Sequence, residues 1–426
     1  MRLDSSSWRR AYLLALPALA VAGPWLSLSF PNPGGTYAFR VAGLLALVPL
    51  LIAWLTRKDG IGTPGKWLLA TAVTAVGWGL LAQFWSEQPT LAISSTLSIA
   101  IPALIAFSYI LAARQVRNGH LLARRGLAIA ALVLWGFGAI QLLTGVALHG
   151  RGGGDWLYGD YVVGPFVNPN NYGVYLAACT IPFVAKIFFS TKAVPAALAV
   201  VSVSVSAYFI SRTGSRSAIL LLALIVVAIL LSKLAKKPDT YLISCGVVGL
   251  IVIVVGRYVW LSNETLRFNY IASGEQASDA GRLSLTLRGL AYFHDTGGAG
   301  LGPGHFAVRA AREGFAVSNA HNVYIEVLAE FGFPLAFMMI GGAASVFCLW
   351  WNSYEEQSPS RPQFLIGETS ASLVAVVVSG VATSSALAEP IWWMLIAMLA
   401  ITVSAPRDGY CKPDTLPTFG ATNGSR

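Results

Sequence analysis

Charged residues are scarce in this chain. Asp, Glu, Lys and Arg together make up 11% of its 426 residues, whereas soluble domains contain about 25%. So few charges cannot cover the surface of a water-soluble globule, and that class of protein is excluded. Hydrophobic residues make up 55% of the chain and its mean hydropathy is +0.64, which indicates a membrane protein.

Cysteine and several short motifs are also rare or missing. The four cysteines show no CxxC or metal-ligand spacing, so neither a disulfide framework nor a metal site is expected. There is no GxxxxGK[ST] loop for a nucleotide. Basic residues form no run long enough to bind nucleic acid, despite a net charge of +10. No internal repeat is visible, so the inverted repeats of many transporters are missing.

Long apolar runs recur along the whole chain. A helix needs roughly 17–25 such residues to cross about 30 Å of hydrocarbon. The runs predict an all-α polytopic membrane protein, with residues 1–426 as a single transmembrane domain. We interpret the first run as an uncleaved span. The twelve predicted spans are 11–30, 38–55, 67–86, 93–113, 125–148, 165–189, 193–211, 214–232, 241–261, 322–350, 363–386 and 388–405.

The distribution of basic residues predicts the orientation. With the N-terminus in the cytoplasm, every lysine lies on the cytoplasmic side, while the opposite side contains only arginines. Short cytoplasmic loops are enriched in Lys and Arg, so this pattern supports both the span count and cytoplasmic termini, including a tail at 406–426. The long outer loop 262–320 separates the ninth and tenth spans. Its Leu, Phe and Tyr content argues against disorder, and we expect short helices at the membrane surface.

Arginines on the outer side suggest an anionic ligand. Arg212 and Arg216 lie in "FISRTGSRSAILLL", and Arg282 and Arg288 lie in "GRLSLTLRGL". Arginine is permanently charged, and its planar fork matches phosphate oxygens. Alternatively, arginines on the outer side only extend to the membrane interface or pair with acidic residues. This interpretation is favoured for Arg309 and Arg312, which lie further along the same loop. The acids available to them are Asp279, Asp295 and Glu313.

A histidine stands at the start of the tenth span, in "SNAHNVYIEVLAEFG". A neutral imidazole accepts a proton at neutral pH, so His321 is a candidate general base, although an interfacial histidine is more often structural. Asn322 is expected to cap the helix or to bind a sugar. Glu326 and Glu330 share a helix face with Asn322. That face must point into the bundle or a wet cleft, because charges facing lipid are very costly.

Two further segments are polar or rich in glycine. "GPFVNPNNYGVYL" places Asn168, Asn170 and Asn171 at the outer mouth of the sixth span, where they cap the helix or contact a polar headgroup. "RGGGDWLYGD" and "GAGLGPGH" are interpreted as turns, since neither stands between a strand and a helix.

Five segments together resemble the bacterial O-antigen ligase/polymerase superfamily. They are "GPFVNPNNYGVYLA", "SRTGSRSAILLL", "AGRLSLTLRGL", "GAGLGPGHF" and "NAHNVYIEVLAEFGFP", in that order between about residues 160 and 335. The resemblance implies a GT-C-like glycosyltransferase of the bacterial inner membrane with a periplasmic active site. It implies a donor glycan linked to undecaprenyl diphosphate, an inverting reaction, and neither metal nor other cofactor.

The resemblance also implies roles for individual residues. His321 corresponds to the family's base and Arg216 to its helix-start arginine; Arg282 corresponds to its loop arginine, with Arg288 as a rival. Arg212, Asn170, Asn322 and Glu326 are expected to support the site. In the ligase branch the acceptor is lipid A–core oligosaccharide, whereas in the polymerase branch it is a second lipid-linked repeat unit. A different class, a secondary transporter or flippase for an anionic lipid or solute, would also use outward arginines. A transporter should have ionisable residues along its whole transport path, whereas in this chain the charged residues gather at one face of the membrane.

Overall fold

The computed structural model describes residues 6–23, 27–28, 36–57, 61–146, 161–166, 168–235, 237–263, 275–315, 320–355, 363–383 and 386–405. Its elements are almost all helices, and one antiparallel pair of two-residue strands joins β1 (Ser27–Leu28) to β2 (Thr36–Tyr37). The first helices are α1 (Ser7–Ala22), α2 (Ala38–Arg57), α3 (Gly62–Leu81), η2 (Ala82–Phe84), α4 (Pro89–Gln115) and α5 (Gly119–Thr144). The middle ones are α7 (Pro169–Cys179), α8 (Ile181–Phe189), α9 (Ala193–Ser211), α10 (Arg216–Leu234) and α11 (Pro238–Ser262). The last are α13 (Glu275–Asp295), α14 (His305–Arg312), α15 (Val323–Glu355), α16 (Gln363–Ala382), η3 (Ala386–Ala388) and α17 (Pro390–Val403).

The architecture confirms an all-α polytopic membrane protein. Within the described residues, nine helices are long and apolar enough to cross a membrane. The other three predicted spans fall on α1, α11 and α17, which have 16, 25 and 14 residues. The predicted span 193–211 coincides with α9, whereas the predicted span 165–189 is divided into α7 and α8 at Thr180. Pro182 in the first turn of α8 cannot donate a backbone hydrogen bond, which favours a helix boundary there.

The centre of the bundle is formed by helices that are covered on most sides. In α4 and in the α7–α8 span, about 72% of the most hydrophobic 18-residue stretch is buried inside the protein. The corresponding share is 22% in α9 and 28% in α2. The outer helices therefore expose rows of leucine, valine and isoleucine, as lipid-facing helices do. Close approach inside the bundle uses small residues. Gly126 of α5, for example, lies so near the carbonyl of Leu13 in α1 that a side chain would clash.

Helices α10 and α16 pack antiparallel and define two ends of the bundle. Gly367 near the start of α16 contacts Ser232 near the end of α10. At the other end, Gly380 of α16 contacts Val323, the first residue of α15. Since α10 is antiparallel to α16, it begins at this same end. We call this the α15-start end.

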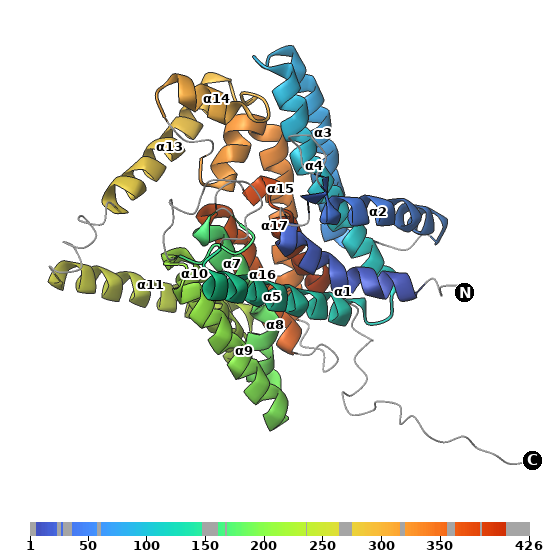
Figure 1. Cartoon of the computed structure of the whole chain (residues 1–426), viewed down its shortest axis with the longest axis vertical. Helices are drawn as coiled ribbons and strands as arrows, with labels where there is room; N and C mark the ends of the chain where they lie inside the picture. Colours follow the sequence, from blue (N-terminus) through green and yellow to red (C-terminus); the bar gives the residue numbers. More distant parts are fainter. Residues whose placement is uncertain are drawn as a thin grey trace, which may run out of the picture.

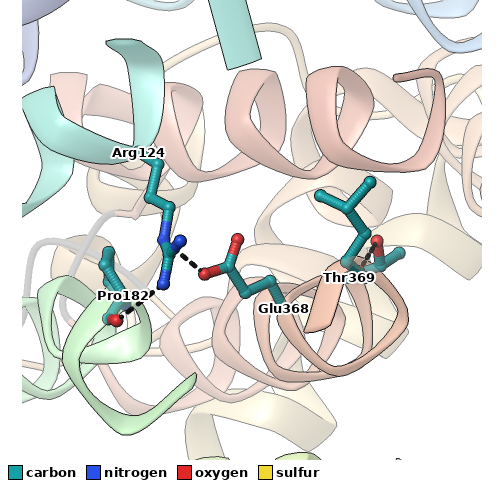
Figure 2. Close-up of polar contacts among 5 residues, drawn as sticks. Arg124, Pro182, Glu368 and Thr369 are labelled. Atoms are coloured by element: carbon teal, nitrogen blue, oxygen red, sulfur yellow. Dashed lines mark hydrogen bonds and ion pairs between the residues drawn. The ribbon is translucent and has the colours of Figure 1, made fainter. Parts of the chain in front are cut away.

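The opposite end contains a buried ion pair (Figure 2). Nε of Arg124 in α5 lies 2.6 Å from Oε1 of Glu368 in α16, and Nη2 of Arg124 donates to the carbonyl of Pro182 at 3.1 Å. The guanidinium also lies 5.4 Å from the ring centre of Phe364. These contacts connect α5, α8 and α16, so the pair is part of the architecture.

Helices α13 and α14 lie together beside α15 (Figure 1). They account for most of the described part of the predicted outer loop; α13 has 21 residues and α14 has 8. Gly289 of α13 packs against Ile325 of α15 with no room for a side chain. A small core formed by Leu285, Tyr292, Phe306 and neighbouring residues joins the two helices to α15.

Candidate functional site

The turn before α15 holds His321 in a strained conformation. Its φ is +49°, in the left-handed region that residues with a side chain seldom adopt. The side-chain oxygen of Asn322 accepts hydrogen bonds from the backbone N–H groups of Tyr324 at 3.0 Å and Ile325 at 3.4 Å. Asn322 therefore caps the helix, one of the two roles expected from the sequence. Strain of this kind is concentrated at functional sites, because the surrounding structure must hold it in place.

Arg282 of α13 acts electrostatically on His321. Burial lowers the pKa of His321 below its ordinary value, and the positive charge of Arg282 lowers that pKa further. Both effects disfavour the imidazolium, so the ring is neutral at pH 7 and able to accept a proton. The structure thus brings a neutral base and a permanent cation together from two elements separated in the sequence.

The rival arginine of α13 has a different partner. Nε of Arg288 lies 3.2 Å from Oε2 of Glu313, and its guanidinium lies over the ring of Phe315. Arg309 pairs with the other oxygen of Glu313 at 3.5 Å. Arg312 forms an ion pair with Glu87. Of the two arginines considered in α13, Arg282 is therefore the one associated with His321.

Glu330 has a structural role that the sequence did not indicate. Its Oε2 accepts from the backbone N–H of Gly304 at 2.8 Å, and its Oε1 accepts from that of Phe306 at 3.1 Å. A carboxylate at the start of a helix satisfies free N–H groups and interacts favourably with the helix dipole. Glu330 thus attaches the first turn of α14 to α15, and both of its carboxylate oxygens are used in this contact.

The segment "GAGLGPGH" forms the turn predicted for it and is fixed to the bundle. Indole N–H groups of Trp78 and Trp85 donate to the carbonyls of Ala299 and Gly300, each at 3.0 Å. Gly332 interrupts α15 with φ +63° and lies against the carbonyl of Gly298. His305 accepts a hydrogen bond from the backbone N–H of Gln88 at 3.0 Å. The segment therefore positions α13 and α14 relative to α15.

Glu326 lies one turn before Glu330 and is arranged differently. Its Oε2 is shielded from solvent and has no hydrogen-bond partner among the residues that the structure describes. Buried polar atoms normally have a partner, so each exception requires an explanation. The carboxylate lies in the first turn of α15, directly after the turn of His321, and can accept a hydrogen bond from a ligand hydroxyl.

Arg216 is the first residue of α10 and is exposed at the α15-start end. The side chain of Ser215 caps this helix by accepting from the N–H of Ala218 at 3.2 Å. Gly173 in the first turn of α7 touches Thr213 and Ala218, so the starts of α7 and α10 are neighbours.

The other predicted supporting residues lie close to the starts of α7 and α10. Arg212 is exposed at the end of α9, and its carbonyl accepts from the N–H of Val162. Asn168 caps α7 by accepting from the N–H of Asn170 at 2.8 Å. Several helix starts, with their partly positive N–H groups, therefore meet at one end, an arrangement that favours anions.

One acidic residue of this region was not singled out from the sequence. Oε1 of Glu389, just before α17, accepts from the side-chain amide of Asn171 in α7 at 3.3 Å. The signal was an acidic residue followed by proline at the start of an apolar run. This signal was not recognised because the sequence shows little polar separation between the eleventh and twelfth predicted spans. In addition, Glu389 and its partner Asn171 are 218 residues apart in the sequence.

The fold defines a multi-pass helical membrane protein whose candidate site combines a neutral histidine with arginines at one end of the bundle. Residues 176–340 match the family model described as O-antigen ligase. The matched segment includes Arg216, Arg282 and His321, and the resemblance seen in the sequence is confirmed for this part of the chain, which is similar to the O-antigen ligase family.

A curated relative is similar over a longer stretch. The teichuronic acid biosynthesis protein TuaE of Bacillus subtilis (strain 168) is 22% identical over 275 residues, which cover 60% of this chain. The match spans about half of that relative, 54% of its length.

Proposed function

We propose that this protein transfers a glycan from undecaprenyl diphosphate to a sugar hydroxyl of lipid A–core oligosaccharide, at the periplasmic face of the bacterial inner membrane. The observation that supports this most is the association of His321 with Arg282 at the start of α15. A neutral imidazole next to a fixed cation provides a base for an incoming hydroxyl and a counter-charge for a departing phosphate.

The first part of the reaction is removal of a proton from the acceptor. A ring nitrogen of His321 takes the hydroxyl proton while the acceptor oxygen attacks the anomeric carbon of the donor sugar. The bond from that carbon to the diphosphate oxygen breaks on the opposite side, so the configuration inverts. The imidazolium then releases its proton to solvent, which is favoured because burial and Arg282 lower the pKa of His321.

The second part is stabilisation of the leaving group. Arg216 and Arg282 hold the diphosphate, and their interaction with it strengthens as negative charge builds on the departing oxygen. The helix starts near Arg216 add N–H groups and partial positive charge. A diphosphate is already a good leaving group, so the proposed reaction requires neither a general acid nor a metal ion.

The remaining polar groups orient the sugars. Oε2 of Glu326 accepts a hydrogen bond from a sugar hydroxyl, because it is otherwise unsatisfied within the described part of the chain. The oxygen of Asn322 is used in capping, which leaves its amide N–H₂ group to donate to a glycan oxygen. These roles are positional, and the reacting atoms are assigned to His321 and the two arginines.

A second candidate function is polymerisation within the same superfamily. It differs only in the acceptor, which would be another lipid-linked repeat unit. The observation that favours it is the relative TuaE, whose name refers to teichuronic acid biosynthesis. The same base and arginines serve both reactions, so the acceptor decides between them.

The test is a reaction with purified protein in lipid nanodiscs. The donor is a glycan linked to undecaprenyl diphosphate, and the acceptor is either lipid A–core or a second lipid-linked glycan. Product with lipid A–core alone supports the ligase, and product with the second lipid-linked unit alone supports the polymerase. Equal activity with EDTA is expected; a strict metal requirement, or no product with either acceptor, would contradict the proposal.

A further inference from the structure

A small pocket lies between α14 and the connection that joins η2 to α4. Its volume is about 100 Å³. Trp85 and Glu87 of the connection line one part of it, and His305 and Val308 of α14 line another. Leu301, in the segment between α13 and α14, also borders it. These residues play no part in the reaction proposed above.

Internal hydrogen bonds hold the walls of the pocket in place. The indole N–H of Trp85 donates to the carbonyl of Gly300 at 3.0 Å. Nε2 of His305 accepts from the backbone N–H of Gln88, so its Nδ1 carries the proton and donates to the carbonyl of Pro303 at 3.0 Å. The pocket is therefore preformed, and a ligand does not have to order these groups when it binds.

Two lining groups can still contact a ligand. The ring of Trp85 packs edge-on against Trp78, with 5.5 Å between the ring centres, yet 40% of the Trp85 surface is exposed. Oε2 of Glu87 pairs with Arg312. A carboxylate can accept about four hydrogen bonds, so Glu87 retains capacity for a ligand. The pocket thus offers a flat apolar face next to a charged acceptor.

This combination of groups favours a sugar over the other candidate occupants. A tryptophan that only anchors the membrane interface would not stand beside a carboxylate, which is costly next to lipid. A phosphate would be repelled by the charge of Glu87. One face of a sugar ring carries C–H groups that pack against an indole, while its hydroxyls donate to a carboxylate at the ring's edge.

We propose that this pocket binds a sugar residue of the glycan that is not the reacting one, a proposal that rests on the proposed function. The N–H of Leu301 donates to the carbonyl of Ala329 at 2.8 Å, and Ala329 lies eight residues after His321 in the chain. At 1.5 Å per helical residue this separation is roughly 12 Å, more than one sugar ring spans. The donor glycan and the acceptor core are both sources of such a sugar.

The experiment measures the binding of two free oligosaccharides to purified protein in nanodiscs. One is the core oligosaccharide cleaved from lipid A, and the other is the glycan released from undecaprenyl diphosphate. Neither carries a lipid or a diphosphate, so their binding does not depend on Arg216 or Arg282. Saturation-transfer NMR gives the Kd of each, and we expect the unmodified protein to bind one of them.

The first pair of variants separates the carboxylate from its ion pair. Glu87→Gln and Arg312→Gln both remove the contact between these residues, but only Glu87→Gln removes a charge that lines the pocket. We expect Glu87→Gln to raise the Kd of the bound oligosaccharide roughly tenfold, because a hydrogen bond to a charged group is lost. Arg312→Gln should leave this Kd unchanged.

The second pair tests the space inside the pocket. Val308→Phe fills it from α14, whereas Ala311→Phe adds the same ring to an exposed position of that helix outside the lining. Binding should be lost in Val308→Phe and retained in Ala311→Phe. The melting temperature of each variant shows whether the fold is kept.

The outcomes distinguish this inference from the proposed function. Weaker binding in Glu87→Gln and Val308→Phe with both controls unchanged supports the sugar site, and the oligosaccharide that binds identifies its source. If the unmodified protein binds neither oligosaccharide, or if Glu87→Gln and Arg312→Gln weaken binding equally, the inference is overturned. The proposed function is judged by transfer from undecaprenyl diphosphate, so it can fail while the sugar site stands, and the reverse.

Discussion

Glu368 and Glu326 are two shielded carboxylates on membrane helices, with opposite arrangements. Glu368 contacts Arg124, which is held in turn by the carbonyl of Pro182. One oxygen of Glu326 has no hydrogen-bond partner within the described ranges. Glu368 lies near the start of α16, whereas Glu326 lies in the first turn of α15, beside the end of α16. Within the described residues, the two carboxylates therefore differ in whether an arginine lies within ion-pair distance.

This difference indicates a structural role for Glu368 and a role in the reaction for Glu326. Ionisable groups inside a membrane are costly, and a closed ion pair offsets part of that cost within the protein. A carboxylate with an unused oxygen retains capacity for a ligand. We therefore expect changes at Arg124–Glu368 to act mainly on stability, and changes near His321 and Glu326 to act mainly on turnover.

The largest effect on activity is expected for His321→Ala. Losing a general base costs roughly a hundredfold to ten-thousandfold in rate, so kcat should fall by this much. The Kd for undecaprenyl diphosphate and the melting temperature should change little, since the arginines and helix starts remain. Turnover near that of the unmodified protein would remove His321 from the reaction.

The corresponding change at the opposite end is Glu368→Ala. It leaves the guanidinium of Arg124 without its carboxylate in a largely buried position, which costs about 3–5 kcal/mol in comparable pairs. We expect a clear loss of thermal stability, measured by the unfolding of purified protein in detergent. The double variant Arg124→Met/Glu368→Leu should recover most of it. A single variant as stable as the unmodified protein would show that the pair contributes nothing.

Arg216→Ala and Arg282→Ala should weaken donor engagement more than they affect stability. Each removes one charge-assisted contact with the diphosphate, and we expect the Kd for undecaprenyl diphosphate to rise roughly tenfold. Lysine at either position should restore only part of the affinity, because the planar fork is lost. Arg309→Ala is the matched control, since Arg309 pairs with Glu313. An unchanged Kd in Arg216→Ala would exclude that residue from the site.

Glu326 and Glu330 provide the same comparison within one helix. Glu326→Gln should lower kcat roughly tenfold, yet leave stability unchanged or raised, because a neutral amide costs less to bury. Glu330→Gln replaces one of two acceptors that hold the start of α14, and should cost about 1–3 kcal/mol of stability. The measurements are initial rates and melting temperatures of both variants. If the two effects were interchanged, the assignment of the two carboxylates would be wrong.

The parts of the fold that depend on local sequence could be predicted. Apolar length alone located the span 193–211, because crossing a bilayer is a requirement on one segment. Capping by Asn322 and Asn168 was likewise foreseen as one of two alternatives, since a cap bonds to its own first turn.

Contacts between distant segments could not be predicted in this way. Glu330 binds backbone N–H groups 26 and 24 residues away, and any backbone N–H is a possible partner, so no residue type identifies it. The sequence also favoured Arg282 only narrowly and left Arg288 as a close rival. The ion pair of Arg288 with Glu313 distinguishes them, and it depends on how α13 and α14 pack. An apolar groove lined by α3, α15, α16 and α17 likewise arises only from packing and has no local signature.

The smallest expected effect concerns pH and tests the link between Arg282 and His321. The base is active when neutral, so activity is lost as pH falls through the pKa of His321. Arg282 contributes to lowering that pKa. Removing its charge in Arg282→Gln should therefore raise the pKa of His321 and move the acid limb of kcat/KM to higher pH, by roughly half a pH unit for a partly screened neighbour. Arg309→Gln should leave the limb in place, because Arg309 faces Glu313. A fall in kcat/KM without movement of the limb would mean that Arg282 binds the diphosphate but does not tune the base.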